Sequence, residues 1–355
     1  MTEKISKISF PQRGFSLSEL IVAMAIGILM TGVIAAFYIN MRGTFRYQED
    51  LARIQESGRF AIDMMARDIR MAGYNGCGTI TDFANTINGG GNAMFDFSKP
   101  VEGFESGYPS GMTGVIAGID AVVIKGVDAS DELVVQAHNA SAAQIGTSEH
   151  TIPAGAILLV TDCAHAAIFQ MTGPKTTGTK TNIVHNKGTG VPGNCEQELG
   201  VSCPGKKEYK FKPGASVMRV FANGYYIAPA SSGNGNSLWR ASLSPDNGAG
   251  TTGTAPEELI EGVESMLISY GLDTNTDRSG DVFKHASEIS SADWSKVVAV
   301  RVSLLLRSQK AKQTTGSQTI VFDRGLAAVP AATTFTDGYL RKVFSETVTV
   351  RNRTP

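Results

Sequence analysis

The strongest constraint on this chain is an uncharged apolar run near its start, LIVAMAIGILMTGVIAAFYI, at residues 20–39. As an α-helix rising about 1.5 Å per residue, this run spans roughly 30 Å, the thickness of one hydrocarbon core. The 14 residues MTEKISKISFPQRG at the start carry three basic residues against one acidic residue. The positive-inside rule therefore predicts that they lie in the cytoplasm, with the rest of the chain across the membrane.

A secretory signal peptide is the alternative explanation for such an N-terminus. Its apolar core would be about 7–15 residues long, and a cleavage site of small residues would follow it. Here the run is longer and leads into a second helical pattern, in which Leu51, Ile54, Ala61, Met65 and Ile69 form one apolar stripe. We therefore predict one long helix over residues 15–73, spanning the membrane at about 20–39 and ending at a C-cap glycine, Gly73.

A carboxylate, Glu19, stands at the border of the apolar run. A charge deep in a bilayer costs about 2.5–3.5 kcal/mol on insertion scales, so it needs an explanation. One explanation is that Glu19 lies near the interface and complements the positive end of the helix. The other is cleavage between Gly14 and Phe15, after which Glu19 of one subunit neutralises the new Phe15 amine of a neighbour. Small residues, among them Gly27 and Gly32, would allow close helix packing.

The stretch RGFSLSELIVAMAIG resembles the class III leader and methylation motif of type IV pilins and type II secretion pseudopilins. The resemblance implies that a prepilin peptidase/methyltransferase cuts after Gly14 and methylates Phe15. It also implies that Glu19 aligns subunits during assembly. Many major pilins have a kinking proline in this helix where this chain has Ala36.

Later stretches resemble the PilW family of minor pilins, among them MARDIRMAGYNGCG, DWSKVVAVRVSLLLRS and YLRKVFSETVTVRNR. This resemblance implies a minor pilin that assembles with other minor pilins and the major pilin to prime and cap a type IV pilus. Pilus biogenesis and twitching motility would depend on it. Its implied partners include a large tip adhesin, connected with cell adhesion, and the inner-membrane assembly platform. A minor pseudopilin of a type II secretion system is the alternative.

The resemblance implies a single-pass inner-membrane protein with a periplasmic C-terminal domain, which moves to the pilus tip after assembly. The predicted parts are a leader at residues 1–14, the helix at 15–73 and a β-rich domain at 74–355. The expected fold class is α+β, a long N-terminal helical spine packed on an antiparallel, pilin-like β domain with long loops. Within the domain, residues 297–308 alternate strictly and predict a half-buried strand. Shorter strands are predicted from DAVVIKGV, ELVVQAH, AILLVTD and YYIAP.

The four cysteines, Cys77, Cys163, Cys195 and Cys203, are an even set that predicts disulfides in an oxidising compartment. Four cysteines allow three pairings. Sequence proximity favours Cys195–Cys203 as a short clip and leaves Cys77–Cys163 as the longer staple.

One loop, DTNTDRSGD, resembles the start of a calcium loop because Asp273, Asn275 and Asp277 alternate and Asp281 is a further oxygen ligand. Against calcium, the sixth place is Arg278 where glycine is expected, and no glutamate stands at the twelfth. A solvated turn between strands is the alternative. No other cofactor is predicted.

Other functions lack their signatures in the sequence. The net charge is -1 and no basic stripe is visible, so no nucleic-acid partner is expected. The five histidines are not clustered in the sequence, and no catalytic motif is visible, so an enzyme such as a signal-anchored periplasmic one is the less favoured hypothesis. The basic residues of the closing segment, Arg341, Lys342, Arg351 and Arg353, are expected on solvent-exposed strand faces.

Overall fold

The computed structural model describes residues 14, 16–77, 80, 82–89, 92–246, 250–311, 316–326 and 332–351. The predicted leader, apart from Gly14, and the predicted methylation site Phe15 lie outside these residues. The chain divides into two compact units, Met1–Leu51 and Ala52–Pro355. One helix, α1 (Leu17–Met71), contributes residues to both units.

In the first unit, α1 is long and apolar enough to cross a membrane by length and composition. Its large apolar side chains are exposed, including Leu20, Phe37 and Phe45, because no other described element of this unit covers them. Thr31 lies within the predicted span, and its hydroxyl donates to the carbonyl of Gly27 at 2.8 Å, which satisfies this polar group inside the helix. The apolar run expected at residues 20–39 is therefore helical throughout.

In the second unit, α1 presents a narrow buried face made of Ile54, Gly58, Ala61, Ile62, Met65, Ala66 and Ile69. This face contains the whole apolar stripe predicted from the sequence except Leu51, and adds Gly58, Ile62 and Ala66. The helix stops where Gly73 takes the left-handed backbone conformation, with φ of 69°. The Gly73 N–H donates to the carbonyl of Lys125 at 2.9 Å, so the helix end is tied to the sheet beneath it. The C-cap prediction for Gly73 is confirmed.

The larger sheet has ten strands, and its main path is β1-β6-β5-β8-β3-β4-β7. β2 pairs with β3, and β9 joins β8 to β10. β1 and β6 pair in parallel, whereas the other pairs are antiparallel. The strands are β1 (Asp82–Asn85), β2 (Val101–Phe104), β3 (Ala121–Asn139), β4 (Gln144–His150), β5 (Ile157–Thr161), β6 (His165–Gln170), β7 (Lys180–Val184), β8 (Ser216–Pro229), β9 (Asn236–Asp246) and β10 (Thr251–Glu261).

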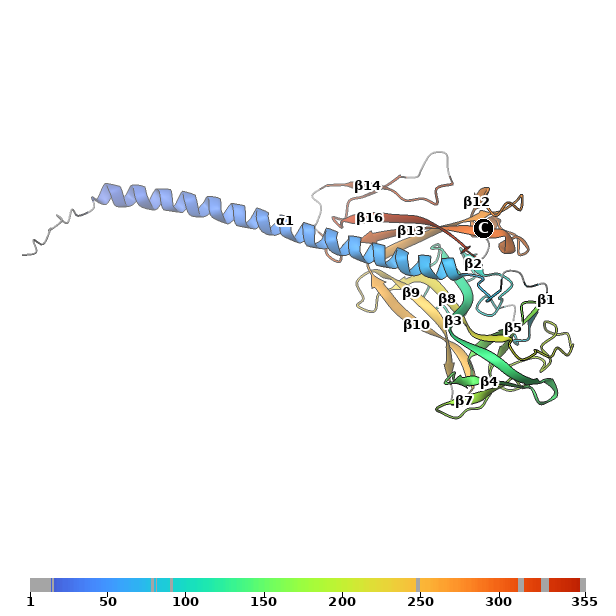
Figure 1. Cartoon of the computed structure of the whole chain (residues 1–355). Helices are drawn as coiled ribbons and strands as arrows, with labels where there is room; N and C mark the ends of the chain where they lie inside the picture. Colours follow the sequence, from blue (N-terminus) through green and yellow to red (C-terminus); the bar gives the residue numbers. More distant parts are fainter. Residues whose placement is uncertain are drawn as a thin grey trace, which may run out of the picture. The chain divides into compact units, whose positions relative to one another are not determined.

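The smaller sheet is an antiparallel array in the order β12-β11-β13-β16. Figure 1 labels β13 and β16 beside α1, and Phe344 of β16 packs against Gly58 of the helix. A two-stranded sheet, β14–β15, and three short 3₁₀ helices complete the described elements. Their bounds are β11 (Val263–Leu272), β12 (Val282–Lys284), β13 (Val297–Arg307), β14 (Gln318–Val321), β15 (Ala332–Phe335), β16 (Arg341–Thr349), η1 (Ala140–Ala142), η2 (Ala286–Glu288) and η3 (Asp293–Lys296).

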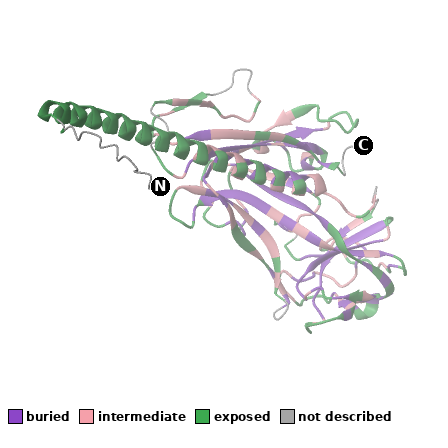
Figure 2. Ribbon diagram, turned by 60° about the vertical axis from the view of Figure 1, so that its left-hand side comes forward, coloured by how far each residue is buried: buried purple, intermediate pink, exposed green. Residues whose placement is uncertain are grey.

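The long helix and the β-rich domain confirm the predicted fold class. Several strands extend beyond their predictions, because DAVVIKGV and ELVVQAH belong to one strand, β3, and YYIAP is only the end of β8. The strand at residues 297–307 was predicted to be half-buried, but nearly all its residues are buried on both faces. Helix α1 covers one face, and the segment around Arg324 and Gly325 covers the other, where the Gly325 carbonyl accepts from Arg301. Figure 2 shows buried residues running along the strands of both sheets.

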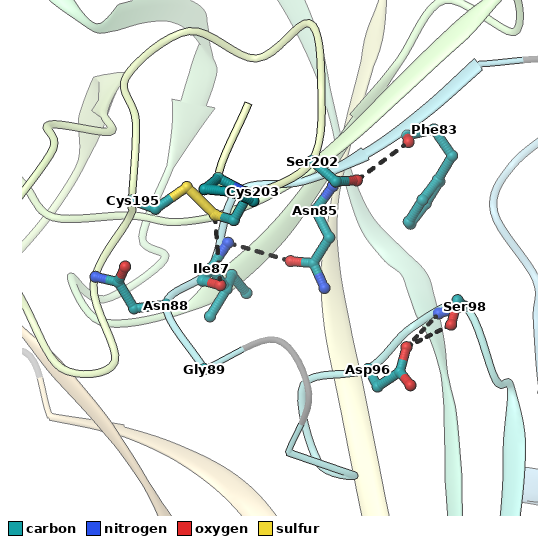
Figure 3. A pocket seen from close by; sticks show the side chains of 11 residues that line it. Phe83, Asn85, Ile87, Asn88, Gly89, Asp96, Ser98, Cys195, Ser202 and Cys203 are labelled. Atoms are coloured by element: carbon teal, nitrogen blue, oxygen red, sulfur yellow. Dashed lines mark hydrogen bonds between the residues drawn. A yellow bond between two sulfur atoms is a disulfide. The ribbon is translucent and has the colours of Figure 1, made fainter. Parts of the chain in front are cut away.

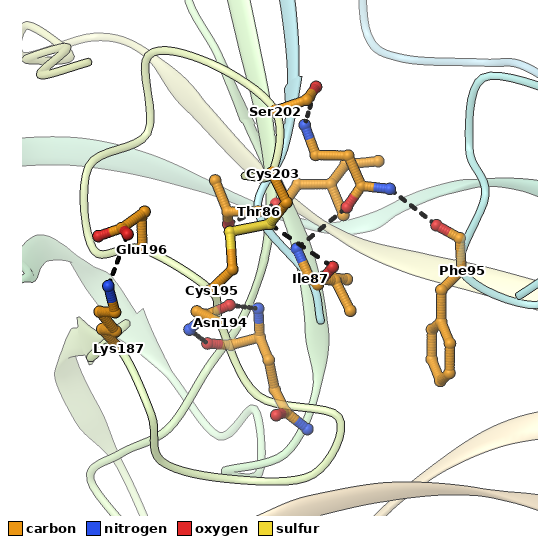
Figure 4. Close-up of a disulfide and its surroundings, with 12 residues drawn as sticks. Thr86, Ile87, Phe95, Lys187, Asn194, Cys195, Glu196, Ser202 and Cys203 are labelled. Carbon is orange, nitrogen blue, oxygen red and sulfur yellow. Dashed lines mark hydrogen bonds and ion pairs between the residues drawn. A yellow bond between two sulfur atoms is a disulfide. The ribbon is translucent and has the colours of Figure 1, made fainter. Parts of the chain in front are cut away.

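Two disulfides have the pairing favoured from sequence proximity. Cys77, just after α1, is bonded to Cys163 beyond β5, with the two Cα atoms 5.5 Å apart. Cys195 is bonded to Cys203 and closes a short loop, drawn in Figure 4. This loop lies along β1, because the Cys203 N–H donates to the carbonyl of Asn85 at 3.0 Å and the Cys195 N–H to that of Thr86 at 2.8 Å. The short clip therefore holds a loop on the outer edge of β1.

Candidate functional site

The candidate assembly site is the start of α1, where Glu19 and Ser16 bond to each other. The Ser16 N–H donates to Oε2 of Glu19 at 2.9 Å, and the Ser16 hydroxyl donates to the same oxygen at 3.0 Å. In return, the Glu19 N–H donates to the Ser16 hydroxyl oxygen at 3.2 Å. These reciprocal bonds are a capping box, which satisfies N–H groups that a helix start otherwise leaves unpaired.

The capping box gives Glu19 a role within one chain, at the positive end of the helix. Both bonds from Ser16 end on Oε2, and no described residue donates to Oε1. The carboxylate can therefore keep its local bonds and still accept a donor from another subunit. Phe15, whose amine the alternative explanation requires, lies outside the described residues, so the pairing stays a prediction.

Two glycines, Gly27 and Gly32, leave open surface along the same helix. A Cβ built at either position meets no heavy atom within 4 Å. Close helix packing in a membrane needs small residues at the contact. The helix start thus combines an available carboxylate oxygen with surfaces that another apolar helix can approach.

The predicted calcium loop, residues 273–281, turns its carboxylates toward its own backbone. Asp273 accepts bonds from the N–H groups of Asn275, Thr276 and Arg278. Asp281 accepts from the Thr274 N–H at 2.7 Å, and its pKa is lowered by that bond and by the Thr274 hydroxyl.

Arg278, which stands where a calcium loop usually has glycine, has φ of 66° and so adopts the backbone conformation of that position. No group of three or more His, Cys, Asp or Glu side chains placed to hold a metal is found among the described residues. Calcium binding by Asp273, Asn275, Asp277 and Asp281 therefore stays a prediction.

A pocket of about 490 Å³ lies beside the Cys195–Cys203 disulfide and is shown in Figure 3. Asp96 is the only titratable side chain among its described lining residues. This carboxylate accepts from the Ser98 N–H at 3.2 Å and pairs with Lys99 at 3.4 Å. The described lining also carries the hydroxyls of Ser98 and Ser202, and the Ser98 hydroxyl donates to the Asp96 carboxylate.

A smaller pocket of about 300 Å³ lies under the end of α1 and contains a buried cation, Lys125, that the sequence analysis did not single out. Its ammonium donates to the carbonyl of Ala93 at 2.7 Å and lies 3.7 Å from the carboxylate of Glu102. Burial lowers the pKa of Lys125 to about 8, against the opposing effect of Glu102. Lysine inside an apolar strand pattern was the only sequence signal of this feature.

Three of the histidines that are scattered in the sequence come together in the ten-stranded sheet. The rings of His138 and His185 are 5.5 Å apart, and His138 and His165 both lie within 6 Å of the Phe211 ring, at 5.9 and 5.7 Å. Burial lowers the pKa of His185 to about 3 and that of His138 to about 4. These three histidines, far apart in the sequence, are therefore close together in the fold.

Arg341 was expected on a solvent-exposed face but is 4% exposed. Its guanidinium bonds both carboxylate oxygens of Glu264 and both of Asp337. The Arg341 bonds lower the pKa of Asp337 to about 2. The expectation for Arg341 was wrong because its two acidic partners come from β11 and from the segment before β16. Arg353 lies outside the described residues.

Comparisons with known proteins match both ends of the chain. Residues 10–35 match the prokaryotic N-terminal methylation motif, and this range contains Gly14, Phe15 and Glu19. Residues 224–352 match the family described as type IV pilus-assembly protein W, and this range contains the whole four-stranded sheet. Searches of curated proteins and of solved structures returned no match.

Proposed function

Because these two matches support a PilW-family pilin, we propose that the chain is a minor pilin that assembles with other minor pilins to prime and cap a type IV pilus. The supporting observation is the combination of two features in one chain. A methylation motif starts a helix with an available carboxylate at Glu19, and the C-terminal sheet lies in the range matched by the pilus-assembly family. Both matches point to a structural pilus component rather than an enzyme.

The physical basis of the proposed assembly is the low cost of the Glu19 charge in a bundle. Alone in a membrane, a carboxylate near the helix start must stay at the interface or be desolvated. In a bundle, Oε1 accepts the Phe15 amine of a neighbour while Ser16 retains Oε2. Partner binding is thereby favoured over the isolated subunit. Pilus biogenesis and twitching motility are the cellular processes that such priming would support.

The proposed role as a minor pilin implies a set of partners. They are other minor pilins, the major pilin, the prepilin peptidase/methyltransferase, the inner-membrane assembly platform and a large tip adhesin. An apolar N-terminal helix behind a prepilin-like start fits an inner-membrane anchor. The proposed location is a periplasmic domain on that anchor before assembly, and the pilus tip afterwards.

A minor pseudopilin of a type II secretion system is the second candidate, because the methylation motif suits both systems. The match over residues 224–352 to a pilus-assembly family favours the pilus. The two candidates differ in their partners, and the partners can be identified directly.

Replacing Gly14 by alanine tests the processing step on which the proposed function depends. A Cβ at Gly14 meets no heavy atom within 4 Å, so the substitution does not disturb the described fold. We expect Gly14→Ala to block leader removal and to exclude the chain from sheared filaments. Intact-mass spectrometry of the purified chain measures trimming and N-methylation. Gly43→Ala is the control, because Gly43 lies in the same unit and a Cβ there also meets no heavy atom within 4 Å. A normally trimmed Gly14→Ala chain would contradict the cleavage assignment.

Calcium binding at residues 273–281 is tested by titrating calcium into the metal-free full chain in detergent. If the loop binds calcium, its midpoint of thermal unfolding rises with calcium concentration, since a ligand that binds only the folded state stabilises it. We expect Asp273→Asn to abolish the rise and Asp246→Asn, outside the loop, to preserve it. A midpoint independent of calcium in the unsubstituted chain would establish the solvated turn.

A further inference from the structure

The outer edge of β16 carries backbone groups that point away from the sheet. β16 is the last strand of the four-stranded sheet and pairs with β13 along its length. At Arg341 the N–H donates to Oε1 of Gln318 at 2.9 Å, and the carbonyl accepts from Nε2 of Gln318 at 2.7 Å. Arg341 therefore directs its backbone outward, and every second residue after it does the same.

The next three outward positions are Val343, Ser345 and Thr347. Among the described residues, no group accepts a hydrogen bond from their backbone N–H groups. The side chains of Ser345 and Thr347 are exposed and that of Val343 is half-buried. Three consecutive outward positions of this strand are thus open to another extended chain.

Several edges of the ten-stranded sheet are covered. The outer edge of β7 is occupied at Val184, which exchanges bonds with Thr172 and Gly173 at 2.7 and 2.8 Å. The Cys195–Cys203 loop lies on the edge of β1 through its bonds to Asn85 and Thr86. These devices prevent uncontrolled strand pairing. Among the described residues, β16 has no such cover beyond Gln318.

The edge of β10 is protected in a different way. Its Thr252 N–H donates to the carbonyl of Val191 at 2.6 Å, and Pro256 occupies a later position with the same outward direction. Proline cannot donate, and it is confined to such edges in sheets. β16 contains no proline within Arg341–Thr349.

The surroundings of β16 also indicate what binds there. The side-chain amide of Gln318 bonds both backbone groups of Arg341, as a peptide group of a neighbouring strand would. The edge is therefore able to bind the backbone of another chain. Lys342 is in β16 and Arg301 is in the neighbouring strand β13, and neither is within 4.0 Å of a carboxylate among the described residues. Arg301 instead bonds the Thr347 hydroxyl at 3.1 Å. Cations that have no carboxylate partner near a free edge favour a partner strand with acidic side chains.

We infer that β16 binds an extended, acidic strand of another pilus subunit, which adds to the four-stranded sheet by main-chain hydrogen bonds. This inference rests on the proposed function and specifies the surface through which the chain meets a partner. The acidic side chains pair with Lys342 and Arg301, and the N–H groups of Val343, Ser345 and Thr347 become bonded.

The first test is hydrogen exchange of the full chain in detergent, alone and co-purified with the other pilus subunits of its host. We expect the outward amides within 341–349 to exchange at least about 10-fold more slowly in the complex, because hydrogen-bonded amides are protected. Carbodiimide crosslinking of the same complex should join Lys342 to an Asp or Glu of the partner. Unchanged exchange in a complex that contains the chain would overturn the inference, and so would a crosslink only to a second copy.

The second test removes one outward donor. Ser345→Pro deletes an N–H that bonds nothing in the described chain, so we expect the melting midpoint to remain and recovery in the complex to fall at least about 10-fold. Thr254→Pro, at an outward position two residues before Pro256 on β10, is the matched control and should assemble normally. Ser345→Ala, which removes only the hydroxyl contact to Ser303, must lose less than the proline variant.

Equal losses in the two Ser345 variants would assign the effect to the hydroxyl and overturn strand addition. Normal assembly of Ser345→Pro would also overturn it while leaving the proposed pilin function intact. The proposed function itself fails if the unsubstituted chain is absent from filaments and from the complex. If Ser345→Pro unfolds, strand addition at β16 is tested by the hydrogen-exchange experiment alone, because that experiment needs no variant.

Discussion

Glu19→Ala is expected to reduce incorporation of the chain into filaments by about 10-fold or more, which corresponds to at least ~1.4 kcal/mol. Membrane insertion should be unchanged or improved, because the substitution removes a charge whose insertion costs up to about 2.5–3.5 kcal/mol at the bilayer centre. Quantitative immunoblots of sheared filaments and of the membrane fraction measure the two effects separately.

The capping box makes a sharper control possible. Glu19→Gln keeps a side chain that can accept from Ser16, as glutamine does in other capping boxes, but it removes the charge. Ser16→Ala keeps the charge and removes the hydroxyl. If charge pairing drives assembly, Glu19→Gln fails like Glu19→Ala, and Ser16→Ala assembles. Normal piliation with Glu19→Gln would contradict the charge argument and leave capping as the role of Glu19.

Acid is expected to destabilise the second unit through His138 and His185. Both have a lower pKa in the folded chain, about 4 and about 3 against an ordinary 6.5, because burial disfavours the charged ring. Below pH 6.5 the unfolded chain therefore binds more protons than the folded one, and stability falls as pH falls. At pH 5 each histidine should lower the free energy of unfolding by about 2 kcal/mol relative to pH 7.5.

Denaturant unfolding of the full chain in detergent at pH 7.5 and pH 5 measures this loss. His185→Phe, which retains a ring beside Phe169, should remove about half of the acid dependence. His285→Gln is the comparison variant at a histidine outside this group, partly buried and 3.7 Å from Glu105. An unfolding free energy that does not change between the two pH values would show that these rings do not carry the acid sensitivity.

Features that depend on local sequence patterns were predicted correctly. The apolar run, the cap at Gly73 and the strand at 297–307 depend on patterns within one segment. The bonds between Ser16 and Glu19 also depend on three-residue spacing, although Glu19 stood out in the sequence only for its charge. Such features need no knowledge of what else the chain brings nearby.

Features that depend on distant partners were missed. His138 and His185 meet because β3 and the end of β7 are neighbours of β4, a pairing that no local pattern contains. Arg341 is buried because Glu264 on β11 and Asp337 converge on it. The free edge of β16 likewise depends on strand order. Alternation predicts a strand but not its place in the sheet.

The most direct test of the central claim is to identify the partners of the full chain. Membranes would be crosslinked, the chain purified in detergent, and the attached proteins identified by mass spectrometry. We expect other minor pilins, together with the major pilin or a large tip adhesin. Type II secretion components in their place, or the absence of any pilin-like partner, would contradict a role in priming a type IV pilus.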